Sequence, residues 1–283
     1  KVTYEEAQQT IKEALKPLGE TYLADLEKGF TSGWIDVMEN KGKRSGAYSF
    51  GPYGTHPFVL LNHHDTLDHM FTLAHEMGHA LHSYYSNSEQ PYIYADYTIF
   101  VAEVASTLNE ALLINYLLNE AKSKQGKKYL LNHYMEQFRT TLYRQTMFAE
   151  FEMLTHQMVE DGEALTPERL SQVYHDLNVT YYGNEIVVDE DVDIEWARIP
   201  HFYYNFYVYK YATGFSAATA LSQQILQEGK PAVDRYLHFL KSGSSDYSIN
   251  LLKTAGVDMT SPEPVNQALK VFEQLLNQME QLA

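Results

Sequence analysis

The pattern of hydrophobic and polar positions along the chain is mostly that of amphipathic helices. Thr3 and Glu6 have the spacing of a capping box, and apolar residues then recur every three or four positions until Gly19. The same period, which places apolar residues on one face of a helix, returns over most of the remaining chain. It predicts helices over about residues 22–30, 66–85, 98–121, 127–160, 166–177 and 200–227, shorter ones from 231 and 245, and a last one from 262 to the end.

Two short segments, 47–50 and 57–61, are the part of the sequence that is typical of β-strands. They flank the turn-forming segment 51–54. We expect segment 57–61 to present a free strand edge, to which an extended peptide adds through main-chain hydrogen bonds. Together with the helices, this predicts one mostly α-helical domain over residues 1–283 with a small β-sheet. The acidic stretch 184–195 is only a weak sign of a division near residue 190.

The composition excludes several classes of protein. The chain has no cysteine, so thiol catalysis, disulfide scaffolds and thiolate zinc sites are excluded. With 37 acidic and 21 basic residues the net charge is −16, which is unsuited to binding the phosphate backbone of nucleic acids. No apolar run reaches the roughly 18 residues that a membrane span requires. We therefore expect a cytoplasmic protein without nucleic-acid or membrane partners.

Residues 75–79 have the sequence H-E-x-x-H, within the helix predicted from residue 66. His75 and His79 are four positions apart, so both imidazoles lie on one face of a helix and can bind the same ion. Glu76 lies close enough to contact a metal-bound water. Zinc suits this arrangement, because two imidazoles and one carboxylate leave a fourth position open. A helical face with incidental histidines is the alternative, and a third ligand would weigh against it.

The third ligand is expected on the helix over residues 98–121. A metzincin would have Gly at position 82 and His at position 85, where this chain has His82 and Tyr85. The carboxylates of Glu103 and Glu110 are seven positions apart and share a helix face, and small residues between them would allow close packing. We assign Glu103 to the metal and Glu110 to the support of a histidine ring or water. An ordinary solvated glutamate is the alternative for Glu110.

Three stretches of the sequence resemble one enzyme family. Residues 72–82 (TLAHEMGHALH), 100–110 (FVAEVASTLNE) and 199–209 (IPHFYYNFYVY) are similar to the thimet oligopeptidase and oligoendopeptidase F family of zinc metallopeptidases. The similarity is greatest to the bacterial oligoendopeptidase F branch and runs from the first predicted helix to the last.

This resemblance implies a zincin-like helical catalytic domain with the small β-sheet near the active site. It implies a deep channel that admits short oligopeptides, which are hydrolysed by a zinc-bound water. One Zn²⁺ per chain is expected, bound by His75, His79 and Glu103, with Glu76 as the general base. Family members have a further N-terminal helical lobe, which is not visible in this chain. The chain therefore resembles a catalytic half, and the missing N-terminal lobe is an expected partner beside the oligopeptide substrates.

The segment that starts at Pro200 is rich in groups that donate hydrogen bonds. A peptidase needs such neutral donors opposite the metal to stabilise the negative oxygen of the tetrahedral intermediate. By the resemblance we assign His201 and Tyr209 as catalytic, and Tyr207 and Tyr204 as substrate-binding. The alternative for each tyrosine is a core residue whose hydroxyl finds a local partner.

Two further positions bear on the binding of substrate. The tyrosine segment departs from the resemblance at Phe206, which stands where thimet-type members have a tyrosine. His56, at the start of the segment 57–61, is expected to touch substrate, with an ordinary loop histidine as the alternative.

Other functions remain open on the sequence. A dipeptidyl carboxypeptidase-like exopeptidase would need a cationic anchor for a peptide terminus, for which Arg198 is a candidate. A half-enzyme that binds zinc and peptides would have little activity without its N-terminal lobe. A non-catalytic binding module is disfavoured because Glu76 and Glu103 are both present.

Overall fold

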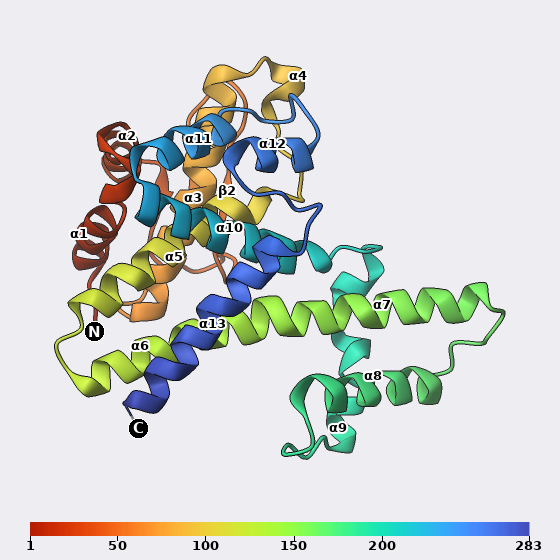
Figure 1. Cartoon of the computed structure of the whole chain (residues 1–283). Helices are drawn as coiled ribbons and strands as arrows, with labels where there is room; N and C mark the ends of the chain where they lie inside the picture. Colours follow the sequence, from red (N-terminus) through yellow and green to blue (C-terminus); the bar gives the residue numbers. More distant parts are fainter. Residues whose placement is uncertain (283) are drawn as a thin grey trace. The chain divides into compact units, whose positions relative to one another are not determined.

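The computed structural model describes residues 1–282, which form two compact units (Figure 1). The first consists of residues 1–134 and the chain from residue 214 onward, and the second of residues 135–213. The chain passes between the units within two helices, α6 (Lys124–Gln137) and α10 (Tyr209–Glu228). The boundaries therefore lie inside helices and not near residue 190.

Helices make up most of the first unit. The capping box at residue 3 is present, since the N–H of Glu6 donates to Thr3 Oγ1 and the N–H of Thr3 donates to the Glu6 carboxylate. The element order, mostly helices with one three-stranded sheet, confirms the predicted mostly α-helical fold with a small sheet. The helices are α1 (Tyr4–Ala14), α2 (Glu20–Thr31), α3 (Leu67–Glu89), α4 (Tyr92–Ala95), α5 (Ala102–Glu120), most of α6 and α10, α11 (Lys230–Leu240), α12 (Ser248–Ala255) and α13 (Glu263–Gln281), with a 3-10 turn η1 (Lys16–Leu18).

The sheet of the first unit has the strand order β1-β3-β2, with β1 at Ile35–Asp36, β2 at Tyr48–Phe50 and β3 at Phe58–Leu60. β3 runs parallel to β1 and antiparallel to β2. Because β3 is paired on both sides, the expectation that residues 57–61 offer a free edge is wrong, and β2 is an outer strand instead. The sequence analysis missed β1, since a strand of two residues has no detectable period.

The packing of α3 against α5 forms the centre of the first unit. Leu73, Ala74 and Met77 of α3 and Val104 and Leu108 of α5 are completely buried. Burial of apolar surface contributes about 25 cal/mol per Å². This interface therefore fixes the two helices against each other. It also fixes the positions of the polar residues on both helices.

The second unit is also helical and has its own core. That core includes Phe148, Phe151 and Tyr174, which are all buried. The elements are the end of α6, a π-helical segment η2 (Phe138–Tyr143), α7 (Arg144–Glu160), α8 (Pro167–Tyr182), α9 (Glu190–Asp193), the 3-10 turns η3 (Glu195–Arg198) and η4 (Pro200–Tyr203), and the start of α10.

The predicted helix over residues 200–227 is interrupted. Residues 200–203 form only the 3-10 turn, residues 204–208 are not helical, and α10 begins at Tyr209. Phe206 has a φ of 53°, in the left-handed region. A right-handed helix cannot continue through such a residue, and the prediction of one continuous helix was wrong at this point.

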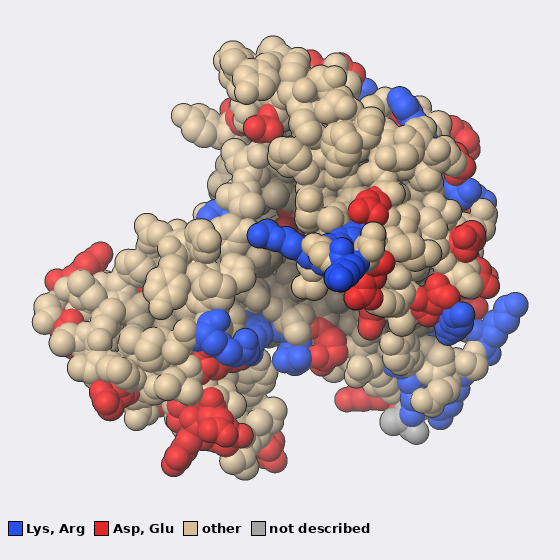
Figure 2. All heavy atoms as spheres, turned by 180° about the vertical axis from the view of Figure 1, so that it is seen from behind, with Lys and Arg blue, Asp and Glu red and all other residues tan. Residues whose placement is uncertain are grey.

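Charged side chains of both signs are scattered over the face seen in Figure 2, with broad uncharged areas between them. Within the described part of the chain, no helix is both long enough and apolar enough to cross a membrane.

Candidate metal centre

The candidate metal centre starts from the middle of α3. The helix is capped by Thr66, whose side chain accepts from the N–H of His69. Two turns further, the rings of His75 and His79 lie edge to face with centroids 4.8 Å apart. Their Nε2 atoms are 3.2 Å apart. The spacing of four residues on a helix therefore brings two imidazole nitrogens to one point.

α5 brings two carboxylates to the same point. Oε2 of Glu103 lies 3.4 Å from Nε2 of His75 and 3.5 Å from Nε2 of His79. Oε1 of Glu110 lies 2.6 Å from Nδ1 of His75. Because the carboxylate accepts a hydrogen bond, Nδ1 of His75 carries a proton, which leaves Nε2 as the nitrogen that would bind a metal ion.

The three donor atoms have the spacing of a tetrahedral metal site. With bonds of about 2.0–2.1 Å, adjacent ligands of a tetrahedral Zn²⁺ are roughly 3.4 Å apart. The separations among His75, His79 and Glu103 are 3.2, 3.4 and 3.5 Å. Within residues 1–282, this is the group of three His, Cys, Asp or Glu residues found close enough to hold an ion. The residues therefore fit zinc in both type and spacing.

The charges around His75 also favour a cation. Burial lowers the pKa of His75, but the hydrogen bond with Glu110 and the charges of Glu110 and Glu103 outweigh burial and raise it to about 9. Burial raises the pKa of Glu103, but the hydrogen bond and charge of His79 and the charge of His75 hold it at about 2. An environment that holds a proton on His75 stabilises positive charge in general.

Glu76 lies beside these residues with a free carboxylate oxygen. The side chain is buried, and its Oε2 has no hydrogen-bond partner in the described part of the chain. Burial raises the pKa of Glu76, while His75 and His79 lower it less. A buried carboxylate without a partner is costly, and it is suited to take up a proton from a molecule bound in the site.

Gly78 was not singled out by the sequence analysis, although it lies inside the H-E-x-x-H segment. A Cβ atom at this position would lie 2.6 Å from Cα of Ser106 and 2.7 Å from the carbonyl oxygen of Ala105. Both are atoms of α5 that cannot move independently of the helix. Glycine at position 78 therefore allows α5 to approach α3 closely enough for Glu103 and Glu110 to reach the histidines. The small residues of α5 were the available signal.

Asn109 was also missed. It is completely buried, donates to the carbonyl oxygen of Ala74 at 3.1 Å and accepts from the hydroxyl of Tyr22 at 3.0 Å. It thus connects α5 to α3 and α2 next to the candidate metal ligands. Its burial depends on three helices, so no local pattern could have identified it.

His82 does not join the histidines of the centre. Its ring stacks on that of Tyr97 with a centroid distance of 3.7 Å, and burial lowers its pKa to about 3. It is therefore an uncharged core residue, in the place where a metzincin would have glycine.

The other predicted site residues lie in different places. His56 stacks on Trp34 and contacts Phe58, and its Nδ1 is 2.7 Å from the carbonyl oxygen of Pro57. The remaining four, His201, Tyr204, Tyr207 and Tyr209, belong to the second unit. The rings of His201 and Tyr204 both contact that of Tyr207, with centroids 5.6 and 6.3 Å away. Their assigned roles stay predictions.

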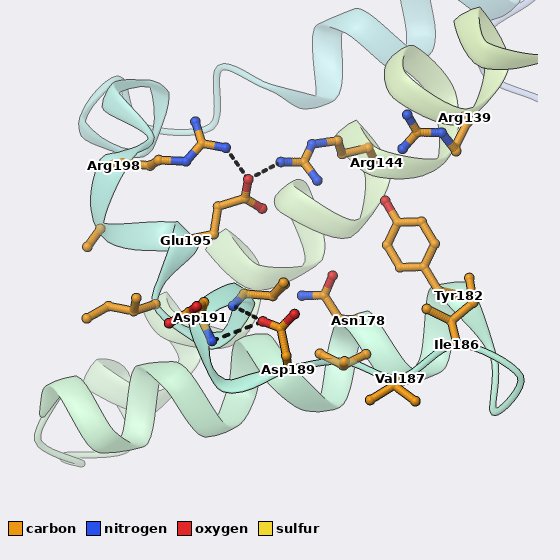
Figure 3. Close-up of a pocket in the computed structure, with 14 residues that line it drawn as sticks. Arg139, Arg144, Asn178, Tyr182, Ile186, Val187, Asp189, Asp191, Glu195 and Arg198 are labelled. Carbon is orange, nitrogen blue, oxygen red and sulfur yellow. Dashed lines mark hydrogen bonds and ion pairs between the residues drawn. The ribbon is translucent and has the colours of Figure 1, made fainter.

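Arg198, the candidate anchor for a peptide terminus, is one of the residues that line a cavity of about 920 Å³ in the second unit (Figure 3). Arg198 and Arg144 both pair with Glu195, whose other oxygen accepts from the hydroxyl of Tyr174. Asp189 and Asp191 also line the cavity. The charge of Arg198 is therefore already compensated within the protein, which weakens its case as an anchor.

Comparison with known proteins shows which sequences and structures the chain is similar to. The chain matches Peptidase family M3 over residues 1–271. It is 60% identical over 282 residues to oligopeptidase PepF of Bacillus subtilis, covering 100% of this chain and 42% of that protein. The structure superposes on a putative peptidase from Chlamydophila abortus with a TM-score of 0.90 and 46% identity, over 100% of this chain and 48% of the other. For oligoendopeptidase-F from Enterococcus faecium the TM-score is 0.75 and the identity 41%, over 99% and 44%. The chain thus spans about half the length of the relatives it matches.

Proposed function

The chain belongs to peptidase family M3, and from this premise we propose that it is the catalytic part of a zinc-dependent endopeptidase that hydrolyses short oligopeptides. The observation that carries the proposal is the tetrahedral spacing of the His75, His79 and Glu103 donor atoms. Beside them, Oε2 of Glu76 has no hydrogen-bond partner among the described residues. The cytoplasm as its location remains a prediction from composition.

His75, His79 and Glu103 would hold one zinc ion, and Glu110 would fix the ring of His75. The bound ion would lower the pKa of a water molecule and polarise the scissile carbonyl group. Glu76 accepts the proton of the attacking water and passes it to the leaving amine. The buried Oε2 of Glu76, which has no hydrogen-bond partner among the described residues, supports this role.

The oxyanion requires hydrogen-bond donors from outside the ligand set. We assign this role to His201 and Tyr209, and the binding of substrate to Tyr204 and Tyr207, with His56 as a further contact. Tyr204 and Tyr209 are exposed within the described residues, which supports the accessibility of these two side chains.

A second candidate function is a half-enzyme that binds zinc and peptides but cleaves them slowly. It applies to this segment acting by itself, which covers 42% of PepF. The relatives' remaining chain would then be the partner that completes the substrate channel. A dipeptidyl carboxypeptidase-like activity has less support, because Arg198 is already paired with Glu195.

The test combines metal analysis with peptide hydrolysis by the parent and by Glu76→Gln. The parent should bind one zinc per chain and cleave short peptides faster than denatured proteins. Glu76→Gln should bind zinc but lose about 10²–10⁴-fold in kcat. Glu89→Gln, an exposed glutamate at the end of the same helix, is the matched control and should keep full activity.

Absence of stoichiometric zinc would remove the central claim. Equal rates for Glu76→Gln and the parent would remove the assigned base. Zinc binding without cleavage, followed by cleavage when the N-terminal part of a relative is added, would favour the half-enzyme.

A further inference from the structure

The tyrosine-bearing segment 203–209 is folded around one unfavourable residue. Phe206 has a φ of 53°, and among the described residues it is the non-glycine residue with a positive φ. A side chain with a Cβ atom is destabilised in this left-handed conformation. Such a residue persists only where its surroundings hold it, and this kind of strain is often found at functional sites.

Three side chains hold Phe206 in place. Its N–H donates to Oε1 of Glu152 at 2.9 Å, and its carbonyl oxygen accepts from Nζ of Lys210 at 3.0 Å. Its ring packs against that of His156 with centroids 4.5 Å apart. Glu152 and His156 come from α7 and Lys210 from α10, so side chains bind the backbone of Phe206 on both sides of its Cα atom.

Glu152 is an unusual residue for its position. It is only 2% exposed, and it lies in the stretch of α7 that supplies Phe148 and Phe151 to the core of the second unit. Its Oε2 has no hydrogen-bond partner within residues 1–282. Burial raises its pKa, against the N–H of Phe206 and the charges of His156 and Lys210. Packing alone does not explain a carboxyl group here, because a buried polar atom without a partner is destabilising.

We infer that Glu152 is a positioning residue that holds segment 203–209 in the form that receives a peptide substrate. The inference rests on the proposed function, which places Tyr204 and Tyr207 at the substrate. These two tyrosines lie within two positions of Phe206, and Tyr207 is in ring contact with Tyr204 and His201. Because the φ of Phe206 sets the course of the chain between them, its relaxation redirects both side chains.

The experiment compares Glu152→Leu and Glu152→Gln with the parent. Glu150→Leu is the matched control: Glu150 is on the same helix and accepts from the hydroxyl of Tyr181 at 2.8 Å, but it is not bonded to the segment. Amide exchange over residues 203–208, zinc content, and KM and kcat for a fluorogenic oligopeptide are measured for each. Glutamine keeps an acceptor oxygen and should behave like the parent.

Loss of the acceptor in Glu152→Leu should speed exchange at the Phe206 amide and raise KM about tenfold, with kcat changing less. Zinc content should be unchanged, because the ligands belong to the other unit. If Glu152→Leu matches Glu150→Leu in both exchange and KM, the inference is wrong. A parent that binds zinc but cleaves no peptide contradicts the proposed function and not the role of Glu152. In that case the amide exchange rates and the affinity for a fluorescently labelled oligopeptide test whether Glu152 positions the segment.

Phe206→Gly provides a second test, and if Glu152→Leu folds poorly, Glu152→Ala removes the acceptor in both backgrounds instead. Glycine adopts a positive φ without penalty. Loss of the Glu152 bond should therefore raise KM several-fold less in the Phe206→Gly background than in the parent. A double-mutant cycle measures this difference. Equal effects in the two backgrounds would show that Glu152 does not act through the conformation of Phe206.

Discussion

Nδ1 of His75 lies 2.6 Å from Oε1 of Glu110, a residue 35 positions later in the sequence. This bond fixes the ring so that Nε2 faces Glu103 and His79. The carboxylate thus supports the candidate metal centre without being one of its three candidate ligands.

We predict that Glu110→Gln weakens zinc binding about 10–100-fold, as is usual for residues that orient a metal-bound histidine. The amide can still accept a hydrogen bond but does not supply negative charge to the imidazole. Competition with a chelating dye measures the affinity. Glu120→Gln, at the exposed end of the same helix, should leave it unchanged. An unaltered affinity in Glu110→Gln would mean that the bond is only structural.

Gly78→Ala should disrupt the centre by separating two helices. Its Cβ would meet backbone atoms of Ala105 and Ser106 at under 3 Å, so α5 must move. We expect a loss of about 1–3 kcal/mol of unfolding free energy and weaker zinc binding. Gly214→Ala is the control, because a Cβ there meets only Cβ of Glu103, at an ordinary 3.5 Å. A Gly78→Ala protein with normal zinc affinity would contradict this account of the helix contact.

Those parts of the molecule that depend on local spacing could be predicted from the sequence. The helical period places His75 and His79 on one face, and the interval between Glu103 and Glu110 places both on another. The structure brings the two faces together. The closeness of that approach depends on Gly78 and Asn109, whose neighbours belong to other helices, and no local pattern specifies it.

Long-range contacts explain the two wrong predictions, a continuous helix through residues 204–208 and a free strand edge at residues 57–61. Segment 204–208 has the composition of a buried helix, but the N–H of Phe206 is bound by Glu152, 54 positions earlier. The central place of β3 follows from pairing with a two-residue strand near residue 35, which is too short to be recognised. Both features arise from partners distant in the chain.

In the second unit, Glu195 makes stability depend on pH. Burial opposes its ionisation, but Tyr174 and Arg144 hold its pKa below the usual 4.5. A depressed pKa means that its stabilisation is present above pH 4.5 and is lost as the pH falls below that value. Glu195→Gln should therefore cost about 2 kcal/mol near neutral pH, and the difference from the parent should narrow in acid. Urea unfolding of both proteins at several pH values, monitored by amide hydrogen exchange over residues 174–195, measures this difference in unfolding free energy. Glu185→Gln, which changes an exposed glutamate, is the control. A difference that does not change with pH would contradict the ion-pair assignment.

Removal of metal should affect the first unit selectively. The candidate ligands lie on α3 and α5, both in that unit, so zinc stabilises it whenever binding is coupled to folding. At free zinc one thousand times Kd, we expect about 4 kcal/mol of added stability. Amide exchange should slow around residues 75–79 and 103–110 on addition of zinc, and much less over residues 144–160. Glu103→Ala should abolish the effect, whereas His156→Gln, which changes a histidine of the second unit, should retain it. Equal protection of both units, or protection that survives Glu103→Ala, would show that zinc binds elsewhere.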